Sequence, residues 1–129
     1  FDIANGSGAS PLGVDLATLD GMANRTYTVT EPFEEKRIAF KGVDLWSVLQ
    51  RAGVPTTAKT VHIVALDDYK IDLSVAELRK GGIILATKAD GEPIPLDHGG
   101  PSRVIFLEGV DAGANPDRWI WSVSHITVS

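Results

Sequence analysis

The sequence DHGGPSR at residues 97–103 places an acidic residue, an imidazole, two glycines, a proline and an arginine directly before the apolar run at 104–107. That run predicts a buried strand. The glycines allow backbone N–H groups to approach a ligand, and Pro101 stiffens the exit from the turn. His98 and Arg103 supply donors for an anion or a heteroaromatic edge. The alternative is an ordinary turn, because Gly, Pro and Asp are common in turns.

Length and composition bound the class of protein. A chain of 129 residues, with 43% hydrophobic and 22% charged residues, predicts a single globular domain at 1–129. Within it, residues 1–13 are expected to form a loose N-terminal segment. The apolar runs, such as 82–86, are too short for a transmembrane helix. The net charge of -5 argues against a nucleic-acid partner.

The sequence contains no cysteine, which excludes disulfides, thiolate metal ligands and thiol nucleophiles within it. It starts at Phe1 without a methionine. We take this as a hint that a leader has been removed and that the protein is exported or periplasmic.

Hydrophobic periodicity predicts an α+β fold with a mixed sheet, because the strands and helices do not alternate as repeated βαβ units. Ser74, followed by Glu77, has the pattern of a helix capping box. Asp90-Gly91 predicts a hairpin turn. Strands are predicted at 1–3, 25–30, 37–40, 60–66, 71–73, 83–87, 104–107 and 119–128, and helices at 43–52 and 75–80.

The order of motifs resembles the molybdopterin-binding domain of the sulfite-oxidase superfamily, from about Thr26 to the C-terminus. The motifs are FKGVDLWSVL at 40–49, Asp68-Tyr69, ILA at 84–86 with GEPI at 91–94, HGGPSR at 98–103 and Arg118-Trp119. The resemblance implies a mixed α+β domain that holds a pyranopterin, whose molybdenum is ligated by one cysteine. That cysteine maps to residues 29–32, which read VTEP here. A hydroxyl or carboxylate is a poor substitute for the thiolate, so we do not expect a molybdenum cofactor.

A second branch of the superfamily resembles this chain more closely in length and in lacking the cysteine. Its members are small, mostly exported proteins that bind a reduced pterin without metal, and some relay pterin levels to a membrane-bound enzyme of cyclic-di-GMP signalling. ALDDY at 65–69 and Gly100-Pro101 carry this resemblance. It implies a non-catalytic, periplasmic pterin sensor or accessory protein. The alternatives are a molybdenum-cofactor oxidoreductase domain or subunit, and an interaction module without a ligand.

A pterin is a flat bicycle with a guanidine-like edge, so its site needs a stacking surface and a carboxylate or carbonyl. The predicted ligand-binding residues are Asp68, Tyr69, His98, Gly99, Gly100, Pro101, Arg103, Trp119 and Trp121. Asp68 is equally well explained as a turn residue bonded to its own backbone, and Arg103 as a partner of strand-end carbonyls. Trp119 and Trp121 are expected on opposite sides of the last strand, so at most one would belong to the core.

Other residues carry simpler interpretations. Trp46 lies on the apolar helix face and is expected in the core. His62 and His125 are expected as satisfied core or edge residues, and the histidines lack partners at zinc-ligand spacing. The serines lack a nucleophile elbow. We therefore predict no catalytic residue and no metal ligand.

Overall fold

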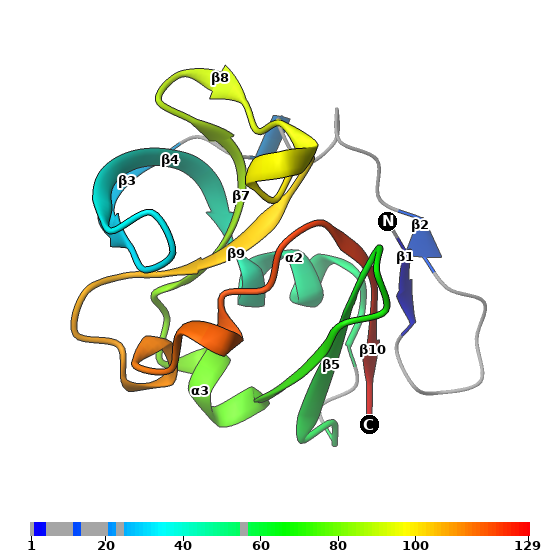
Figure 1. Ribbon diagram of the computed structural model, residues 1–129. Helices are drawn as coiled ribbons and strands as arrows, with labels where there is room; N and C mark the ends of the chain where they lie inside the picture. Colours follow the sequence, from blue (N-terminus) through cyan, green and yellow to red (C-terminus); the bar gives the residue numbers. More distant parts are fainter. Residues whose placement is uncertain (1, 5–11, 14–20, 23–24, 55–56) are drawn as a thin grey trace.

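The computed structural model describes residues 2–4, 12–13, 21–22, 25–54 and 57–129, and it forms two five-stranded sheets that lie side by side with α2 between them (Figure 1). The first sheet has the order β2-β1-β10-β5-β6. Its strands are β1 (Asp2–Ala4), β2 (Leu12–Gly13), β5 (Thr60–Ala65), β6 (Lys70–Ser74) and β10 (Val123–Val128). Because β1 and β10 are parallel and the other pairs antiparallel, this sheet is mixed.

The second sheet has the order β3-β4-β7-β8, with β9 also paired to β7. Its strands are β3 (Arg25–Glu31), β4 (Lys36–Asp44), β7 (Ile83–Ala89), β8 (Glu92–Pro93) and β9 (Arg103–Phe106). The strand predicted at 37–40 extends through Asp44, because β4 pairs along its length with β3 on one side and with β7 on the other. The predicted α+β class with a mixed sheet is confirmed.

Helices α2 and α3, which lie within the described range 25–129 apart from 55–56, are short and are fixed by their caps. Helix α2 (Leu45–Arg51) begins after Asp44, whose carboxylate accepts a hydrogen bond from the Ser47 N–H at 3.1 Å. Helix α3 (Val75–Arg79) has the predicted capping box: Ser74 Oγ accepts from the Glu77 N–H, and Glu77 Oε1 accepts from the Ser74 N–H, both at 3.0 Å. Three short 3₁₀ turns complete the elements: η1 (Leu96–His98), η2 (Asp111–Gly113) and η3 (Pro116–Arg118).

The predicted strand at 119–128 begins four residues later than expected. Ser122 has a φ of +50°, which interrupts an extended strand, and its N–H donates to Gly99 O at 2.8 Å. Strand β10 therefore starts at Val123, and Trp119 and Trp121 lie before it. The prediction that these tryptophans alternate across the last strand is wrong.

The N-terminal predictions are covered in part. Strand β1 appears at Asp2–Ala4, close to the predicted 1–3, and pairs with β10. Of the segment 1–13 that was expected to be loose, residues 12–13 form β2, and residues 1 and 5–11 lie outside the described residues.

The hydrophobic core includes Phe40, Leu45, Ile63 and Phe106, and it encloses two charged side chains. Glu31 and Arg103 are 0% and 1% exposed and belong to different strands, β3 and β9. Charged residues are almost never this deeply buried unless they are paired. This buried pair lies beneath the candidate site.

Candidate ligand-binding site

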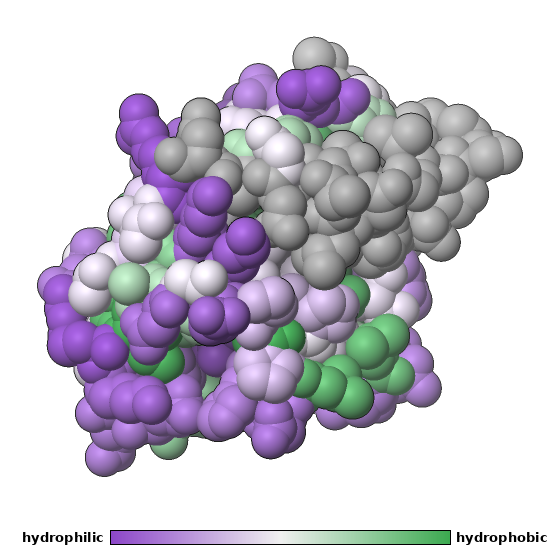
Figure 2. Space-filling model, turned by 90° about the horizontal axis from the view of Figure 1, so that it is seen from above, coloured by the Kyte–Doolittle hydropathy of each residue, from purple (hydrophilic) through white to green (hydrophobic). Residues whose placement is uncertain are grey.

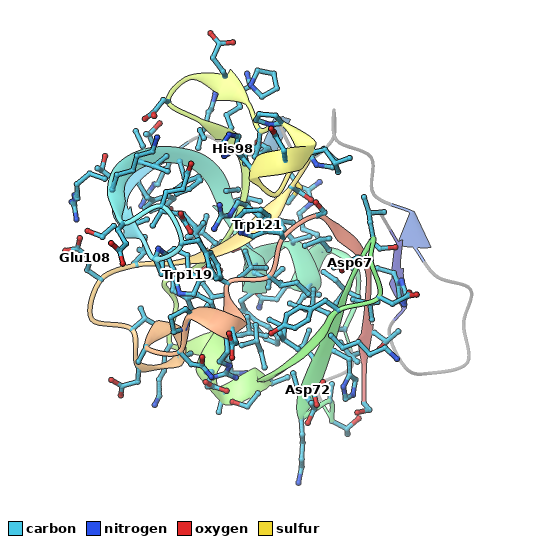
Figure 3. All side chains as sticks on the ribbon, viewed as in Figure 1. Asp67, Asp72, His98, Glu108, Trp119 and Trp121 are labelled. Atoms are coloured by element: carbon cyan, nitrogen blue, oxygen red, sulfur yellow. The ribbon has the colours of Figure 1, made fainter. Side chains whose placement is uncertain are left out.

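A pocket of about 420 Å³ opens where three connecting segments meet. The β3–β4 turn contributes one residue, the end of β5 one, the β5–β6 turn two, and the segment from η3 to β10 four. The lining residues are Phe33, Ala65, Asp67, Tyr69, Asp117, Trp119, Ile120 and Trp121. We call this the aromatic pocket. Figure 3 places Trp119 and Trp121 close together near the middle of the molecule, with Asp67 on the β5–β6 turn beside them.

The β5–β6 turn is folded so that Tyr69 faces the aromatic pocket. Asp68 adopts a φ of +69°, a left-handed conformation that aspartate tolerates better than most residues. The Tyr69 N–H donates to Asp67 Oδ1 at 3.1 Å, and the Tyr69 hydroxyl donates to Asp117 O at 2.7 Å. The tyrosine thus joins the β5–β6 turn to the loop that carries the tryptophans.

Each tryptophan is held by aromatic and polar neighbours. Trp119 packs against Phe106 with ring centroids 5.6 Å apart, and its Nε1–H donates to Gly113 O at 3.0 Å. Trp121 meets the ring of Phe33 edge-on, at 5.7 Å and 84°. Trp121 Nε1 is buried, and the described residues supply no acceptor for it. The aromatic pocket therefore has rigid walls and one unsatisfied donor in a lining side chain.

The buried pair Glu31–Arg103 supports the Trp121 wall from behind. Arg103 Nη2 donates to Glu31 Oε1 at 3.2 Å, and its guanidinium lies 5.2 Å from the ring centres of both Phe40 and Trp121. Burial lowers the pKa of the Arg103 guanidinium, and the charge of Glu31 opposes that shift. The carboxylate of Glu31 also accepts from the backbone N–H of Phe33 at 3.0 Å. One ion pair thus positions two walls of the pocket.

The stretch at 97–103 lies behind the same wall. The Gly99 and Gly100 N–H groups donate to Leu96 O and Pro95 O, so both are used within the turn. Gly99 has a φ of +93°, and a Cβ there would come within 2.6 Å of the Trp121 ring. The glycines therefore permit close packing on the indole rather than presenting free N–H groups.

The loop that carries Asp117 and Trp119 is clamped to α3. Arg118 Nη1 donates to Glu77 Oε2 at 2.9 Å, and Nη2 donates to the backbone oxygen of Asp72 at 2.8 Å. Its hydrogen bond to Glu77 lowers the pKa of that carboxyl to about 2, against the opposing effect of burial. Arg118 is thus committed to structure.

Sequence and structure comparisons place this geometry in a known family. The model of the oxidoreductase molybdopterin-binding domain matches residues 10–128. The chain belongs to the oxidoreductase molybdopterin-binding domain family. It is 30% identical to mitochondrial sulfite oxidase of Macaca fascicularis over an alignment that covers 83% of this chain and 23% of that protein. The crystal structure of the sulfane dehydrogenase SoxCD from Paracoccus pantotrophus is similar in fold, with a TM-score of 0.78 at 19% identity, over 98% of this chain and 37% of that one.

For a member of the molybdopterin-binding domain family, the implied ligand contains a pterin, and the structure divides the predicted residues into three groups. Tyr69, Trp119 and Trp121 line the aromatic pocket. Asp68 lies instead in a second hollow, which we call the polar hollow; it is lined by His62, Val64, Asp68, Lys70, Asp72, His125 and Thr127. His98, Gly99, Gly100, Pro101 and Arg103 do not line the aromatic pocket.

Five lining residues were not among the predicted site residues: Phe33, Ala65, Asp67, Asp117 and Ile120. Phe33 stands in a charged segment and resembled an exposed loop residue. Asp67 belongs to the ALDDY motif that the family resemblance used, and Asp117 precedes the Arg118-Trp119 pair, so proximity to these motifs was the available signal. Within the described ranges, no three His, Asp or Glu side chains gather in a way that could hold a metal ion.

Proposed function

We propose that this molybdopterin-binding domain binds a pterin in the aromatic pocket and does not catalyse a reaction. The observation that carries the proposal is the set of four aromatic rings, from Phe33, Tyr69, Trp119 and Trp121, around a cavity of about 420 Å³. Stacking of a flat heterocycle on an aromatic side chain contributes roughly 1–3 kcal/mol per ring in nucleic-acid complexes. The volume lies within the usual range for small-molecule sites.

The side chains near Glu31 do not fit a molybdenum centre. The sequence has no cysteine to supply a thiolate, and both oxygens of Glu31 are already used. Oε1 accepts from Phe33 N–H and Arg103, and Oε2 accepts from Glu34 N–H at 2.7 Å. This carboxylate is fully buried and paired with Arg103, and a carboxylate is a poor ligand for a metal that is held by a soft thiolate. We therefore propose a metal-free pterin, in its reduced form, as the ligand.

The proposal includes a role as a periplasmic sensor or accessory protein for a membrane signalling enzyme. It is supported by the exposed hydrophobic residues near the pocket mouth. Leu66, which follows the lining residue Ala65, is 59% exposed and donates its N–H to Ser122 O, beside Trp121. The lining residues Phe33 and Tyr69 are 50% and 44% exposed. On the coloured part of the face seen in Figure 2, hydrophobic side chains lie in patches among hydrophilic ones.

The described part of the chain contains no helix that is long and apolar enough to cross a membrane. In the proposal, the membrane enzyme is a partner of this domain. A photo-crosslinking residue at Leu66, with one at Lys80 as the control, tests this part of the proposal. Crosslinks that form at Leu66 only when pterin is present support it, and equal labelling at both positions contradicts it.

The ligand is tested by calorimetric titration of the purified protein with reduced and oxidised pterin. We expect saturable binding heat, with a lower dissociation constant for the reduced form than for the oxidised form. Metal analysis of protein produced in a host that makes molybdenum cofactor should find no stoichiometric molybdenum. Absence of heat at millimolar pterin would contradict pterin binding and favour an interaction module without a ligand.

A molybdenum-cofactor oxidoreductase domain is the second candidate, because the named relatives are a sulfite oxidase and a sulfane dehydrogenase. This chain spans less than two fifths of either relative, so their activities are proposals for it. Stoichiometric molybdenum in the same metal analysis would favour this candidate over the metal-free one.

A further inference from the structure

The charged residues around the aromatic pocket predict which pterins the pocket binds. We infer that the pocket selects pterins without a phosphate group, through the carboxylates of Asp67 and Asp117. This inference rests on the proposed function, since it specifies the ligand of the same site. It concerns the charge of the ligand's side chain, which aromatic stacking alone does not determine.

Two acidic residues line the pocket without a lining cation beside them. Asp67 and Asp117 are exposed lining residues, and no lysine, arginine or histidine is among the residues that line the cavity. All 12 Lys and Arg residues and all 3 His residues of the sequence fall in the described ranges, so none stands at a position outside them. A phosphate ester placed here would meet like charge.

Three cations near the pocket residues are already bound to other groups, and Lys70, next to Tyr69, lines the polar hollow instead. Arg103, behind Trp121, is paired with Glu31, and Arg118, next to Asp117, is paired with Glu77. His98 Nδ1 lies 3.1 Å from Glu34 Oε1. Recruiting any of them to a phosphate would break an existing ion pair, and for Arg103 it would leave a buried carboxylate unpaired.

The same carboxylates suit the amino edge of a pterin. That edge presents an exocyclic amine and a ring N–H side by side, and a carboxylate can accept from both at once. Asp67 uses Oδ1 to accept from Tyr69 N–H, and no bond from a described residue reaches its Oδ2. Asp117 is fixed through its backbone, which donates to Asn115 and accepts from Tyr69, so its carboxylate can turn toward a ligand. Tyr69 thus holds both aspartates at the pocket.

The test compares hydroxymethylpterin with its phosphate monoester by calorimetry at low and high salt. We expect the ester to bind at least about tenfold more weakly, the size of a unit-charge repulsion near a protein surface. The difference should shrink as salt rises, because exposed charges are screened. Equal or tighter binding of the ester would overturn the selectivity while leaving pterin binding intact. Absence of binding by both compounds would overturn the proposed function and this inference with it.

Variants that remove negative charge inside and outside the pocket test whether Asp67 and Asp117 cause the selectivity. The double variant Asp67→Asn with Asp117→Asn should reduce the ratio of the two dissociation constants to within about threefold of unity, since asparagine keeps the shape and removes the charge. Glu92→Gln, on exposed β8 and outside the pocket, changes the net charge in the same direction and should leave the ratio unchanged. A ratio that falls equally in the Glu92 variant would assign the selectivity to net charge and overturn the role of the two aspartates.

Discussion

The aromatic pocket and the polar hollow have the same volume, about 420 Å³ each, yet their walls differ completely. Four aromatic rings surround the first, and histidine, lysine and aspartate side chains surround the second. Asp68 and Tyr69 are adjacent in sequence but line different hollows, because the turn places them on opposite sides. Size alone therefore does not identify a pterin site, whereas the chemistry of the wall does.

The two regions also differ in what lies beneath them. The aromatic pocket is backed by the buried pair of Glu31 and Arg103, whereas the polar hollow contains an exposed pair in which His62 Nδ1 lies 2.7 Å from Asp72 Oδ1. Buried pairs are costly to break, and exposed pairs contribute little. This difference leads to four predictions.

The largest effect is expected at Glu31. Glu31→Gln leaves the charge of Arg103 buried without a partner and should lower the free energy of unfolding by about 3–5 kcal/mol. The matched change in the polar hollow, Asp72→Asn, should cost less than about 1 kcal/mol. Urea denaturation of the two variants measures both values. Adding Arg103→Met to Glu31→Gln should recover part of the lost free energy of unfolding. Similar losses for Glu31→Gln and Asp72→Asn would contradict the expected difference between the buried and the exposed pair.

The second effect concerns ligand affinity. Trp121→Ala removes a wall of the aromatic pocket and should weaken pterin binding about tenfold to a hundredfold, from the stacking energy of one ring. His125→Ala, in the polar hollow, should leave the dissociation constant within about twofold. Calorimetry on both variants, with thermal unfolding to confirm that each is folded, makes the comparison. Equal losses would place the ligand outside the aromatic pocket.

The third effect is a pH dependence of stability, caused by the ion pair between Arg118 and Glu77. The pKa of Glu77 is about 2 in the folded protein against an ordinary 4.5, so its stabilising interaction is complete above pH 4.5 and is lost as pH falls through about 2. Unfolding free energies of the wild type and Glu77→Gln should differ by a constant amount above pH 4.5. The difference should narrow between pH 4.5 and 2, and a difference independent of pH across this window would count against the clamp.

The smallest effect separates two neighbouring aspartates. Asp68→Asn should change pterin affinity by less than about twofold, because Asp68 lies in the polar hollow and asparagine also tolerates a positive φ. Asp67→Asn, one residue earlier, should weaken binding of unphosphorylated pterin by more than this. Calorimetry with the same ligand preparation compares them. A larger loss at Asp68 would restore it as the carboxylate of the site.

The sequence predicted features that depend on local signals. Residue order alone predicts the capping box at Ser74, a helix in the region of Leu45–Arg51 and the alternation of apolar and polar residues along strands. It did not predict which side of a turn each residue faces, because that depends on the φ of Asp68 and on the hydrogen bond from Tyr69 to Asp117, 48 positions away. The pairing of Glu31 with Arg103 spans 72 positions and has no local pattern.

The structure brings part of the predicted site together in one pocket, and ligand binding at these residues stays a prediction. Tyr69, Trp119 and Trp121 meet in one pocket, whereas Phe33 joins it from a turn with no pocket signal in its own segment. The export, the signalling partner and the metal-free state of the ligand stay predictions; crosslinking at Leu66 tests the partner, and metal analysis tests the metal-free state.

The Glu31–Arg103 pair also constrains how this domain can change over evolutionary time. Replacing Glu31 alone by cysteine would leave the buried Arg103 guanidinium without a carboxylate. Loss of Arg103 alone would leave the buried Glu31 carboxylate without a cation. A lineage that exchanges the ion pair for a thiolate at position 31 must therefore alter two codons far apart in the gene, and each single step passes through a less stable protein. Each single substitution is expected to lower the free energy of unfolding, and only the double exchange leaves no buried charge without its partner.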